Sequence, residues 1–440
     1  MERRLLRAGA RILAGLGLAA VMTPMCLTGS SYAAGERRHK ESAQETPANK
    51  PGVNASQPPA FSIPVEPLGF NAPSTFYLGQ RERLLSLDFL DEDHLLFTFH
   101  TPGLIRRTNP SEEDERQIRA MVLKLPQGTV EAEALWTVHG RDRYLWMLKG
   151  GKFLLKDRDD LEQGDASLQL KPLLHFPGPL LWLEMDPEQR YLVTDSYEPE
   201  AAAAQPGDVP SPSTASADMS DGLDSGKPDI VVRILRRATG EVMLVSHVRT
   251  TVHLPINSDG YLEVLRSTGR TWLLNLSYFT GGSKTVGKVD SICSPPLDFI
   301  SHDEVLANTC TQDGRRELVA VTTDGHPLWK LDSGPTQVWP LFVVAANGTR
   351  FAVETLTVSH AVAPFSPLSI DDVKGQMVQV FDAEGANQEL RASASPVLDG
   401  GGNVAFSPSG ARIAVLDAGA IEVYELPAQP AQPGQPARAH

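Results

Sequence analysis

Short apolar runs separated by polar turns dominate the chain. In "VAFSPSGARIAVL", two apolar strands flank a turn that contains Ser, Pro and Gly, which is the pattern of a β-hairpin. Five further stretches share this order, and each has Asp, Asn, Ser or Gly where the backbone must reverse. They begin at Leu87, Leu183, Leu254, Asp298 and Phe342. Only Asn109–Ala120, which is mostly charged, comes near helical periodicity. The pattern therefore predicts an all-β protein.

A second kind of hairpin, with a glycine in its turn, follows several of the first kind. These glycines are Gly128, Gly240, Gly325 and Gly385. One hairpin of each kind makes a four-stranded unit of about 50 residues, a repeat length typical of propeller blades. We count seven units, which begin near Leu84, Arg143, Leu180, Val252, Pro296, Thr336 and Gly402. The second and fourth are the least regular, so six or eight units are the alternatives.

The last unit has only three strands, "NVAFSPS", "RIAVLD" and "AIEVYEL". A propeller must close into a ring, because open strand edges promote aggregation. We expect the segment around Phe61–Leu78 to supply the missing outer strand. The predicted fold is an all-β propeller of seven four-stranded blades, whose ring is closed by an N-terminal strand.

Phe406–Pro427 resembles a blade of a WD-repeat or YVTN-type propeller. Thr322–Asp332 and Leu235–Leu244 resemble the turn and outer strand of quinoprotein-style blades. The resemblance extends over about Phe76–Pro427 and implies the fold. Fold alone does not specify an activity.

The N-terminus has the pattern of a secretory signal. An apolar run, Ile12–Met22, follows four basic residues, Arg3, Arg4, Arg7 and Arg11. Small residues follow Pro24. The run is about half of the ~20 residues that a membrane span requires. We therefore expect cleavage after Ala33 or Ala34 and export to the periplasm or the extracellular space, with no later membrane span.

Three other segments are rich in Pro, Ala, Ser and charge, a composition typical of disorder. We expect a tether over residues 34–75, whose end closes the ring, an insertion over 198–229 and a tail over 428–440. The signal occupies residues 1–33 and the propeller residues 76–427. These boundaries describe one folded domain, and we expect a monomer.

The charge and the cysteines narrow the possible functions. A formal net charge of −14 argues against nucleic-acid binding and against electrostatic attachment to anionic lipid. After signal removal only Cys293 and Cys310 remain, and two cysteines in an oxidising compartment favour one disulfide.

Two segments invite a binding interpretation that their residues do not support. Gly282–Val289 matches most of a phosphate-binding loop, but Val289 stands where a hydroxyl is needed, which favours a blade loop. Asp157–Asp165 approaches a calcium loop, but Leu161 occupies a ligand position, which favours a solvated hairpin turn. We predict no metal, cofactor or catalytic residue from linear motifs.

Two functional hypotheses follow. The favoured one is an exported non-catalytic scaffold that binds an envelope or extracellular protein, peptide or glycan through its loops. The alternative is a lactonase-like or quinoprotein dehydrogenase-like enzyme with its site in the channel, for which the candidate residues are Asp88, Glu184, Asp186 and Asp298. These carboxylates are equally well explained as turn residues. Most tryptophans fall in predicted strands, and one or two at a channel mouth could stack on a sugar.

Overall fold

The computed structural model describes residues 57–72, 83–101, 115–198, 230–363, 366 and 368–429. All of these belong to the second of two units in the chain, Pro47–His440. The predicted signal, the insertion apart from Glu198, most of the tether and nearly all of the tail lie outside the described residues. In the described part of the chain, no helix has the length and apolar character that a membrane span needs.

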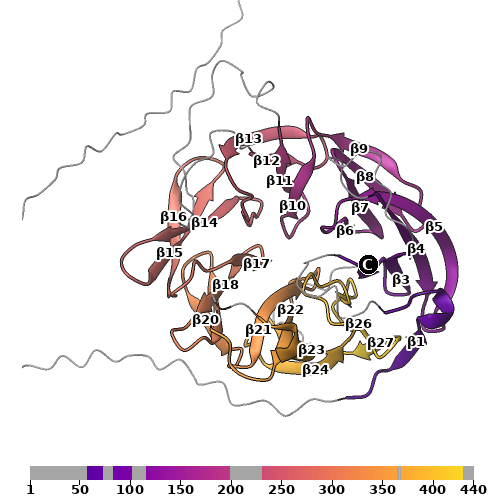
Figure 1. The fold of residues 1–440 in the computed structure, drawn as a ribbon. Coiled ribbons are helices and arrows are strands. Elements are labelled where there is room, and N and C mark those ends of the chain that lie inside the picture. The colour runs from indigo at the N-terminus through magenta and orange to yellow at the C-terminus, as the bar shows by residue number, and fades with distance from the viewer. Residues whose placement is uncertain are drawn as a thin grey trace, which may run out of the picture. The chain divides into compact units, whose positions relative to one another are not determined.

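Seven antiparallel sheets surround a common centre (Figure 1). Blade 1 consists of β2 (Leu85–Phe89), β3 (His94–His100), β4 (Glu115–Lys124) and β5 (Thr129–His139). Blade 2 consists of β6 (Leu145–Leu148), β7 (Lys152–Asp157), β8 (Asp160–Asp165) and β9 (Lys171–His175). Blade 3 consists of β10 (Leu180–Met185), β11 (Tyr191–Tyr197), β12 (Ile230–Arg236) and β13 (Glu241–Val248). In each of these three sheets, the strands follow chain order from the inner to the outer strand.

Blades 4 to 7 complete the ring. Blade 4 consists of β14 (Gly260–Arg266), β15 (Thr271–Tyr278) and β16 (Ser283–Asp290), and blade 5 of β17 (Leu297–Ser301), β18 (Glu304–Cys310), β19 (Arg316–Thr322) and β20 (Pro327–Asp332). Blade 6 consists of β21 (Gln337–Val344), β22 (Arg350–Val358), β23 (Val373–Asp382) and β24 (Gln388–Ala394). Blade 7 consists of β25 (Val404–Phe406), β26 (Arg412–Asp417), β27 (Ala420–Glu425) and β1 (Phe61–Pro64). Two short 3-10 helices, η1 (Glu66–Leu68) and η3 (Ile370–Asp372), lie in connections. The predicted seven-bladed propeller is confirmed.

The N-terminal strand closes the ring as predicted. β1 pairs with β27 in antiparallel register, with Phe61 opposite Val423 and Ile63 opposite Ile421. The Val65 N–H extends the ladder by donating to the Gly419 carbonyl at 3.0 Å. Ile63 is 3% exposed and belongs to the apolar cluster that joins blade 7 to blade 1. Closure therefore combines backbone pairing with apolar burial.

Blade 4 is irregular, as the sequence indicated, whereas blade 2, which the sequence also marked as irregular, forms a complete four-stranded sheet. Its regular sheet has three strands, and residues 252–257 lie along the inner side of β14. Ile256 forms an isolated bridge with Tyr261, and the Pro255 carbonyl accepts from the Leu262 N–H at 2.8 Å. Pro255 cannot donate in return, because proline has no N–H. This segment takes the inner position of the fourth blade without forming a continuous ladder.

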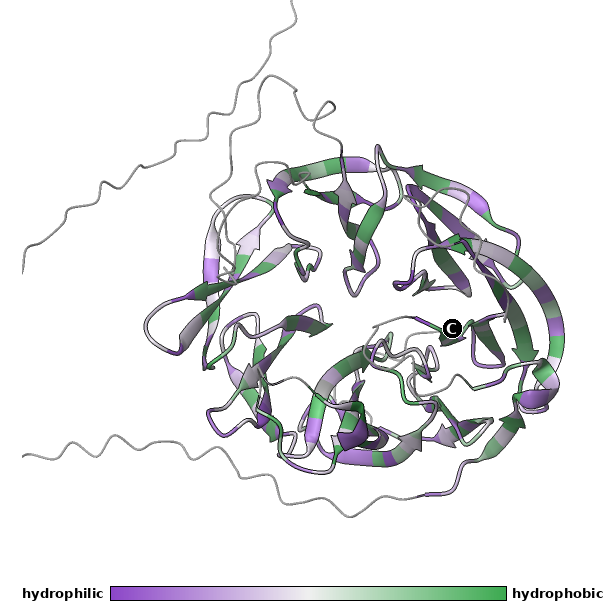
Figure 2. Ribbon diagram, in the orientation of Figure 1, coloured by the Kyte–Doolittle hydropathy of each residue, from purple (hydrophilic) through white to green (hydrophobic). Residues whose placement is uncertain are grey.

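Apolar clusters fill the spaces between neighbouring blades. Hydrophobic and hydrophilic residues alternate along many strands, so a blade presents apolar side chains to its neighbours (Figure 2). Leu96 and Phe153, for example, join blades 1 and 2, and Val193 and Ile256 join blades 3 and 4. The core is thus divided among the blade interfaces.

Two local interpretations differ from the structure. The charged segment Asn109–Ala120 contributes its described residues, Glu115–Ala120, to strand β4, whose inward positions are buried. The charges fall on both faces of this strand: Glu115 and Arg119 are half-buried, whereas Arg116 is buried on the same face as Ile118 and Ala120. Gly282–Val289 is likewise not a loop, because all but Gly282 belong to strand β16, which pairs with β15. A paired strand cannot wrap its N–H groups around a phosphate.

Candidate functional site

Three ionisable side chains from blades 3, 4 and 5 meet near the centre of the ring. Glu184 lies on β10, His253 in the inner segment of blade 4 and Asp298 on β17. His253 Nδ1 is 3.0 Å from Glu184 Oε2, and His253 Nε2 is 3.6 Å from Asp298 Oδ1. His253 Nε2 also donates to the Leu297 carbonyl at 2.7 Å. The imidazole therefore links three blades.

The surroundings of His253 favour its charged form. Desolvation opposes the charge, but the Glu184 and Asp298 carboxylates outweigh it and raise the pKa of His253 to about 11. Nε2 donates to the Leu297 carbonyl, and Nδ1 is in ion-pair contact with Glu184 Oε2. His253 is therefore a cation at neutral pH and has no free nitrogen that could accept a proton.

Asp195 adds a third carboxylate to this group. It lies opposite Trp182 in the β10–β11 pairing, and directly paired residues point to the same face of a sheet. Glu184, two residues after Trp182, shares that face. Asp195 is fully buried; its Oδ2 accepts from the Val252 N–H at 2.7 Å, whereas its buried Oδ1 has no hydrogen-bond partner. Burial, reinforced by Glu184, raises the pKa of Asp195 to about 6.

Trp182 differs from the other tryptophans whose side chains are described. Its indole is 41% exposed and lies edge-on to the His253 ring, with 6.1 Å between centroids. Trp136, Trp146, Trp272 and Trp329 are between 5% and 9% exposed and fill blade interfaces. We call Trp182, Glu184, Asp195, His253 and Asp298 the inner-strand site. It combines an exposed aromatic surface with three carboxylates.

The donor atoms of Glu184, His253 and Asp298 lie within 4.8 Å of one another, close enough to consider a divalent cation. One feature of the geometry disfavours this. The carboxylates contact opposite nitrogens of the ring, whereas ligands of one ion must converge on one point. The arrangement is that of an imidazolium between two anions.

Asp88 belongs to a neighbouring group that involves blades 1 and 2. Burial raises its pKa to about 6, although Ser86, Arg143 and Arg83 favour the ionised form. Arg143 keeps solvent access, but crowding by protein atoms and by Arg83 lowers its pKa to about 10, so it remains a cation at neutral pH. Arg143 also interacts electrostatically with Glu184. It is therefore shared between the two groups.

Asp186 does not join the inner-strand site. Its Oδ1 accepts from the Tyr191 N–H at 2.6 Å, and its carbonyl accepts from the Gln189 N–H at 2.9 Å. These bonds close the turn between β10 and β11. Burial, with Glu188 beside it, raises the pKa of Asp186 to about 6. Of the four carboxylates considered for an enzyme site, Glu184 and Asp298 both contact His253, whereas Asp88 is related to Glu184 only through the charge of Arg143.

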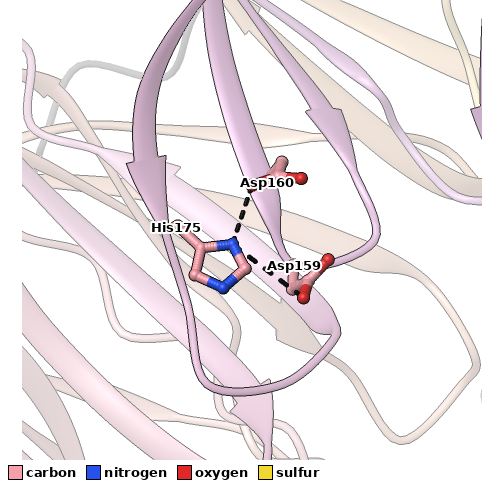
Figure 3. Close-up of side chains that lie close together, drawn as sticks. All are labelled: Asp159, Asp160 and His175. Atoms are coloured by element: carbon pink, nitrogen blue, oxygen red, sulfur yellow. Dashed lines mark hydrogen bonds and ion pairs between the residues drawn. The ribbon is translucent and has the colours of Figure 1, made fainter.

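A second acidic group lies on the surface of blade 2. Figure 3 shows His175 of β9 beside Asp159 and Asp160 at the β7–β8 turn. His175 Nδ1 is 2.8 Å from Asp160 Oδ1 and 3.9 Å from Asp159 Oδ2. The hydrogen bond to Asp160 raises the pKa of His175. His175 is 69% exposed, so the group is best described as a solvated ion pair.

The segment Asp157–Asp165 forms the β7–β8 hairpin, which agrees with a hairpin turn. Its carboxylates have separate partners: Asp157 contacts His139 at 2.9 Å, and Asp165 accepts from the Ser167 N–H at 2.9 Å. Leu161 is fully buried. These oxygens do not converge as the ligands of a calcium loop would.

Cys293 and Cys310 form a disulfide, with 5.6 Å between their Cα atoms. The bond ties the segment that precedes β17 to the end of β18, so it lies within blade 5. Blade 5 also contributes Asp298 to the inner-strand site. The disulfide therefore stabilises a blade that carries one wall of that site.

The sequence reasoning missed His253 and Asp195. Glu184 and Asp298 were recognised because each is a charged residue within the first apolar strand of a hairpin. His253 precedes the predicted strand of blade 4 by one residue. Asp195 lies in β11, the second strand of blade 3, and the sequence does not show to which face of the sheet its side chain points. A search for every charged or exposed aromatic residue on the strands nearest the ring centre would have found His253 and Trp182.

No family model matches the chain, and no curated protein matches it. Among solved structures, the chain is similar to the C-terminal WD40 domain of Sif2, with 11% identity, a TM-score of 0.37 and coverage of 79% of this chain and 98% of that one. It is also similar to the uncomplexed acylaminoacyl peptidase of Pyrococcus horikoshii, with 10% identity, a TM-score of 0.44 and coverage of 79% and 52%.

A chain of the mitotic checkpoint complex has 9% identity and a TM-score of 0.33, with coverage of 86% of this chain and 97% of that one. All three likenesses are low in identity, and the description of the fold rests on the strand pairing of this chain. The ring of seven sheets, closed by β1, makes the chain a seven-bladed β-propeller.

Proposed function

We propose that this chain is an exported, non-catalytic propeller scaffold that binds a partner protein through the inner-strand site. The observation that carries the proposal is Trp182, whose large indole is 41% exposed beside three carboxylates. An exposed aromatic residue with a few nearby polar groups is the composition of a recognition site. The N-terminal signal pattern supports a partner in the cell envelope or outside the cell.

The charge state of His253 supports binding over catalysis. Histidine acts as a general base only when a neutral nitrogen can accept a proton near the working pH. The pKa of about 11, the ion pair of Nδ1 with Glu184 and the hydrogen bond of Nε2 to Leu297 are consistent with a protonated His253.

Affinity capture with the purified chain as bait tests this proposal. We expect one stoichiometric protein from solubilised envelope to be retained by the native chain and lost with Trp182→Ala. Val245→Ala, which truncates a 46% exposed residue on the outer strand β13, is the matched control and should retain the partner. The same retention by Trp182→Ala, or no retention by the native chain, would contradict the proposal.

A channel-centred enzyme is the second candidate, and Glu184 and Asp298 remain the residues that favour it. Lactone hydrolysis or dye-linked alcohol oxidation by the purified chain would support it if Glu184→Gln abolished the activity. Activity that survives this substitution would not come from the inner-strand site.

A further inference from the structure

We propose that the inner-strand site binds an organic cation, the ammonium or guanidinium group of a lysine or arginine side chain on a partner protein. This inference rests on the proposed function, because it specifies the chemistry that a partner must present. Four features carry it: an imbalance of charge, an unpaired buried oxygen, an exposed indole and a route from solvent.

The charge imbalance is the first feature. Glu184, Asp195 and Asp298 face one imidazolium, that of His253. Arg143 also interacts with Glu184, but it is shared with Asp88. The group therefore keeps a surplus of negative charge. Such a surplus in a protein-lined space attracts a cation more strongly than it would in bulk water.

The unpaired oxygen is the second feature. Asp195 is fully buried, and its Oδ1 has no hydrogen-bond partner although its Oδ2 accepts from Val252. A buried carboxylate oxygen without a donor is costly. Asp195 shares the sheet face of Trp182 and Glu184, so this demand for a donor is directed at the same place as the charge surplus. Ammonium and guanidinium groups carry several donors and no acceptor.

The indole and its exposure complete the site. The face of an indole ring attracts cations, and a guanidinium can also stack on it. Trp182 is 41% exposed, and the Asp298 side chain is 33% exposed, so solvent reaches both the ring and a carboxylate. His253 already occupies the place between Glu184 and Asp298. The incoming cation would therefore bind on the Trp182 side of the carboxylates and add to the His253 ion pairs without replacing them.

A glycan would use the indole but not the charge surplus. Sugar hydroxyls can donate to carboxylates, yet a neutral sugar leaves the negative charge uncompensated. The three carboxylates therefore favour a cation over a neutral sugar.

Small probes test the inference without any partner. We would titrate the purified chain with N-acetyl-arginine methylamide, N-acetyl-lysine methylamide and the neutral analogue N-acetyl-citrulline methylamide. The signal followed is the indole N–H resonance of Trp182, assigned with Trp182→Phe. We expect the arginine or the lysine probe to shift this resonance, with an affinity at least tenfold above that of citrulline. Equal effects of all three probes, or none, would overturn the inference.

Substitutions then locate the binding. Glu184→Gln and Asp298→Asn should each weaken probe binding about tenfold, because a hydrogen bond to a charged acceptor is stronger than one to a neutral amide. Glu241→Gln on β13 is the matched control, since Glu241 is an exposed carboxylate paired with Arg236, and it should bind as the native chain does. Unchanged binding by both site variants would place the cation elsewhere and overturn the assignment.

The native chain alone provides a second test if the variants fold poorly. Binding should weaken as salt concentration rises and as the pH falls through about 6, where Asp195 becomes protonated. Salt-independent binding, or preference for a neutral oligosaccharide or Zn²⁺ at the Trp182 resonance, would overturn the inference. If the probes bind but no partner is captured, the cation site is supported and the scaffold role is contradicted. If a partner is captured but the probes do not bind, the scaffold role is supported and the cation site is contradicted.

Discussion

The charge on His253 can be tested through pH. Its pKa is about 11 in the folded chain, against 6.5 for an unperturbed histidine. A raised folded-state pKa gives stability that is fully present below about 6.5 and is lost as the pH rises towards about 11. Each pH unit in this window corresponds to at most about 1.4 kcal/mol. Because the side chain is 36% exposed, solvent screening reduces the total to about 1–3 kcal/mol.

His253→Gln removes the charge and leaves a neutral hydrogen-bonding side chain. Near pH 6 we expect this variant to be less stable than the native chain by about 1–3 kcal/mol, because Glu184, Asp195 and Asp298 lose their imidazolium. The difference should shrink as the pH rises from about 7 to about 10, where the native His253 begins to lose its proton. Urea denaturation at a series of pH values measures the difference.

Histidine NMR measures the cause directly. The ring resonances assigned to His253 by the variant should show no titration between about pH 5 and about pH 9. His326→Gln, in the exposed β19–β20 turn, is the matched control and should leave the pH profile of stability unchanged. Titration of His253 near its usual pKa, together with parallel stability profiles of native chain and His253→Gln, would refute the ion-pair interpretation of the inner-strand site.

Three further predictions concern closure, the disulfide and export. Ile63→Ala should lower the free energy of unfolding by about 2–4 kcal/mol in denaturant titrations, as expected for a buried isoleucine in the closing strand. Ser62→Ala, at an exposed position of the same strand, should not lower it. Equal denaturation midpoints for Ile63→Ala and the native chain would show that β1 contributes little to stability. Cys293→Ser should cost about 3 kcal/mol, as should reduction of the native chain, and an unchanged urea midpoint would contradict a stabilising role. Terminal sequencing of chain recovered from the envelope should begin just after Ala33 or Ala34; an intact Met1 would contradict cleavage.

The sequence predicted the blades well because their determinants are local. A two-residue alternation and turn residues specify a hairpin over a dozen positions, independent of the rest of the chain. In six of the seven blades, the inner strand therefore begins within two residues of the predicted start of the unit. Examples are Leu85, where Leu84 was predicted, and Leu297, where Pro296 was predicted. The closing strand required one non-local argument, that a ring has no free edge, and β1 at Phe61–Pro64 confirms it.

Charged strands and the composition of the site were harder to predict. In the first half of β4, charged and apolar residues mix with no strong local preference, and only pairing with β3 and β5 settles the strand. The inner-strand site joins residues from three blades, so no spacing along the chain could reveal it. Glu184 and Asp298 were visible as charges in apolar strands, whereas the role of Asp195 depends on which sheet face it occupies.

The irregularity of blade 4 and the position of the site have a common physical origin. Pro255 interrupts the inner ladder, so residues 252–257 are not held to β14 by regular pairing. Side chains provide other attachments: His253 donates to the Leu297 carbonyl at 2.7 Å, and the Asn257 side-chain amide donates to the His302 carbonyl at 3.0 Å.

Both of these acceptors belong to blade 5, so the inner segment of blade 4 is fixed to its neighbour as well as to its own sheet. A regular ladder would hold His253 in the plane of blade 4. Release from that ladder lets the imidazolium lie between Glu184 of blade 3 and Asp298 of blade 5, where it leaves the exposed indole of Trp182 beside a surplus of carboxylates. The break in the repeat is thus the feature that creates the site.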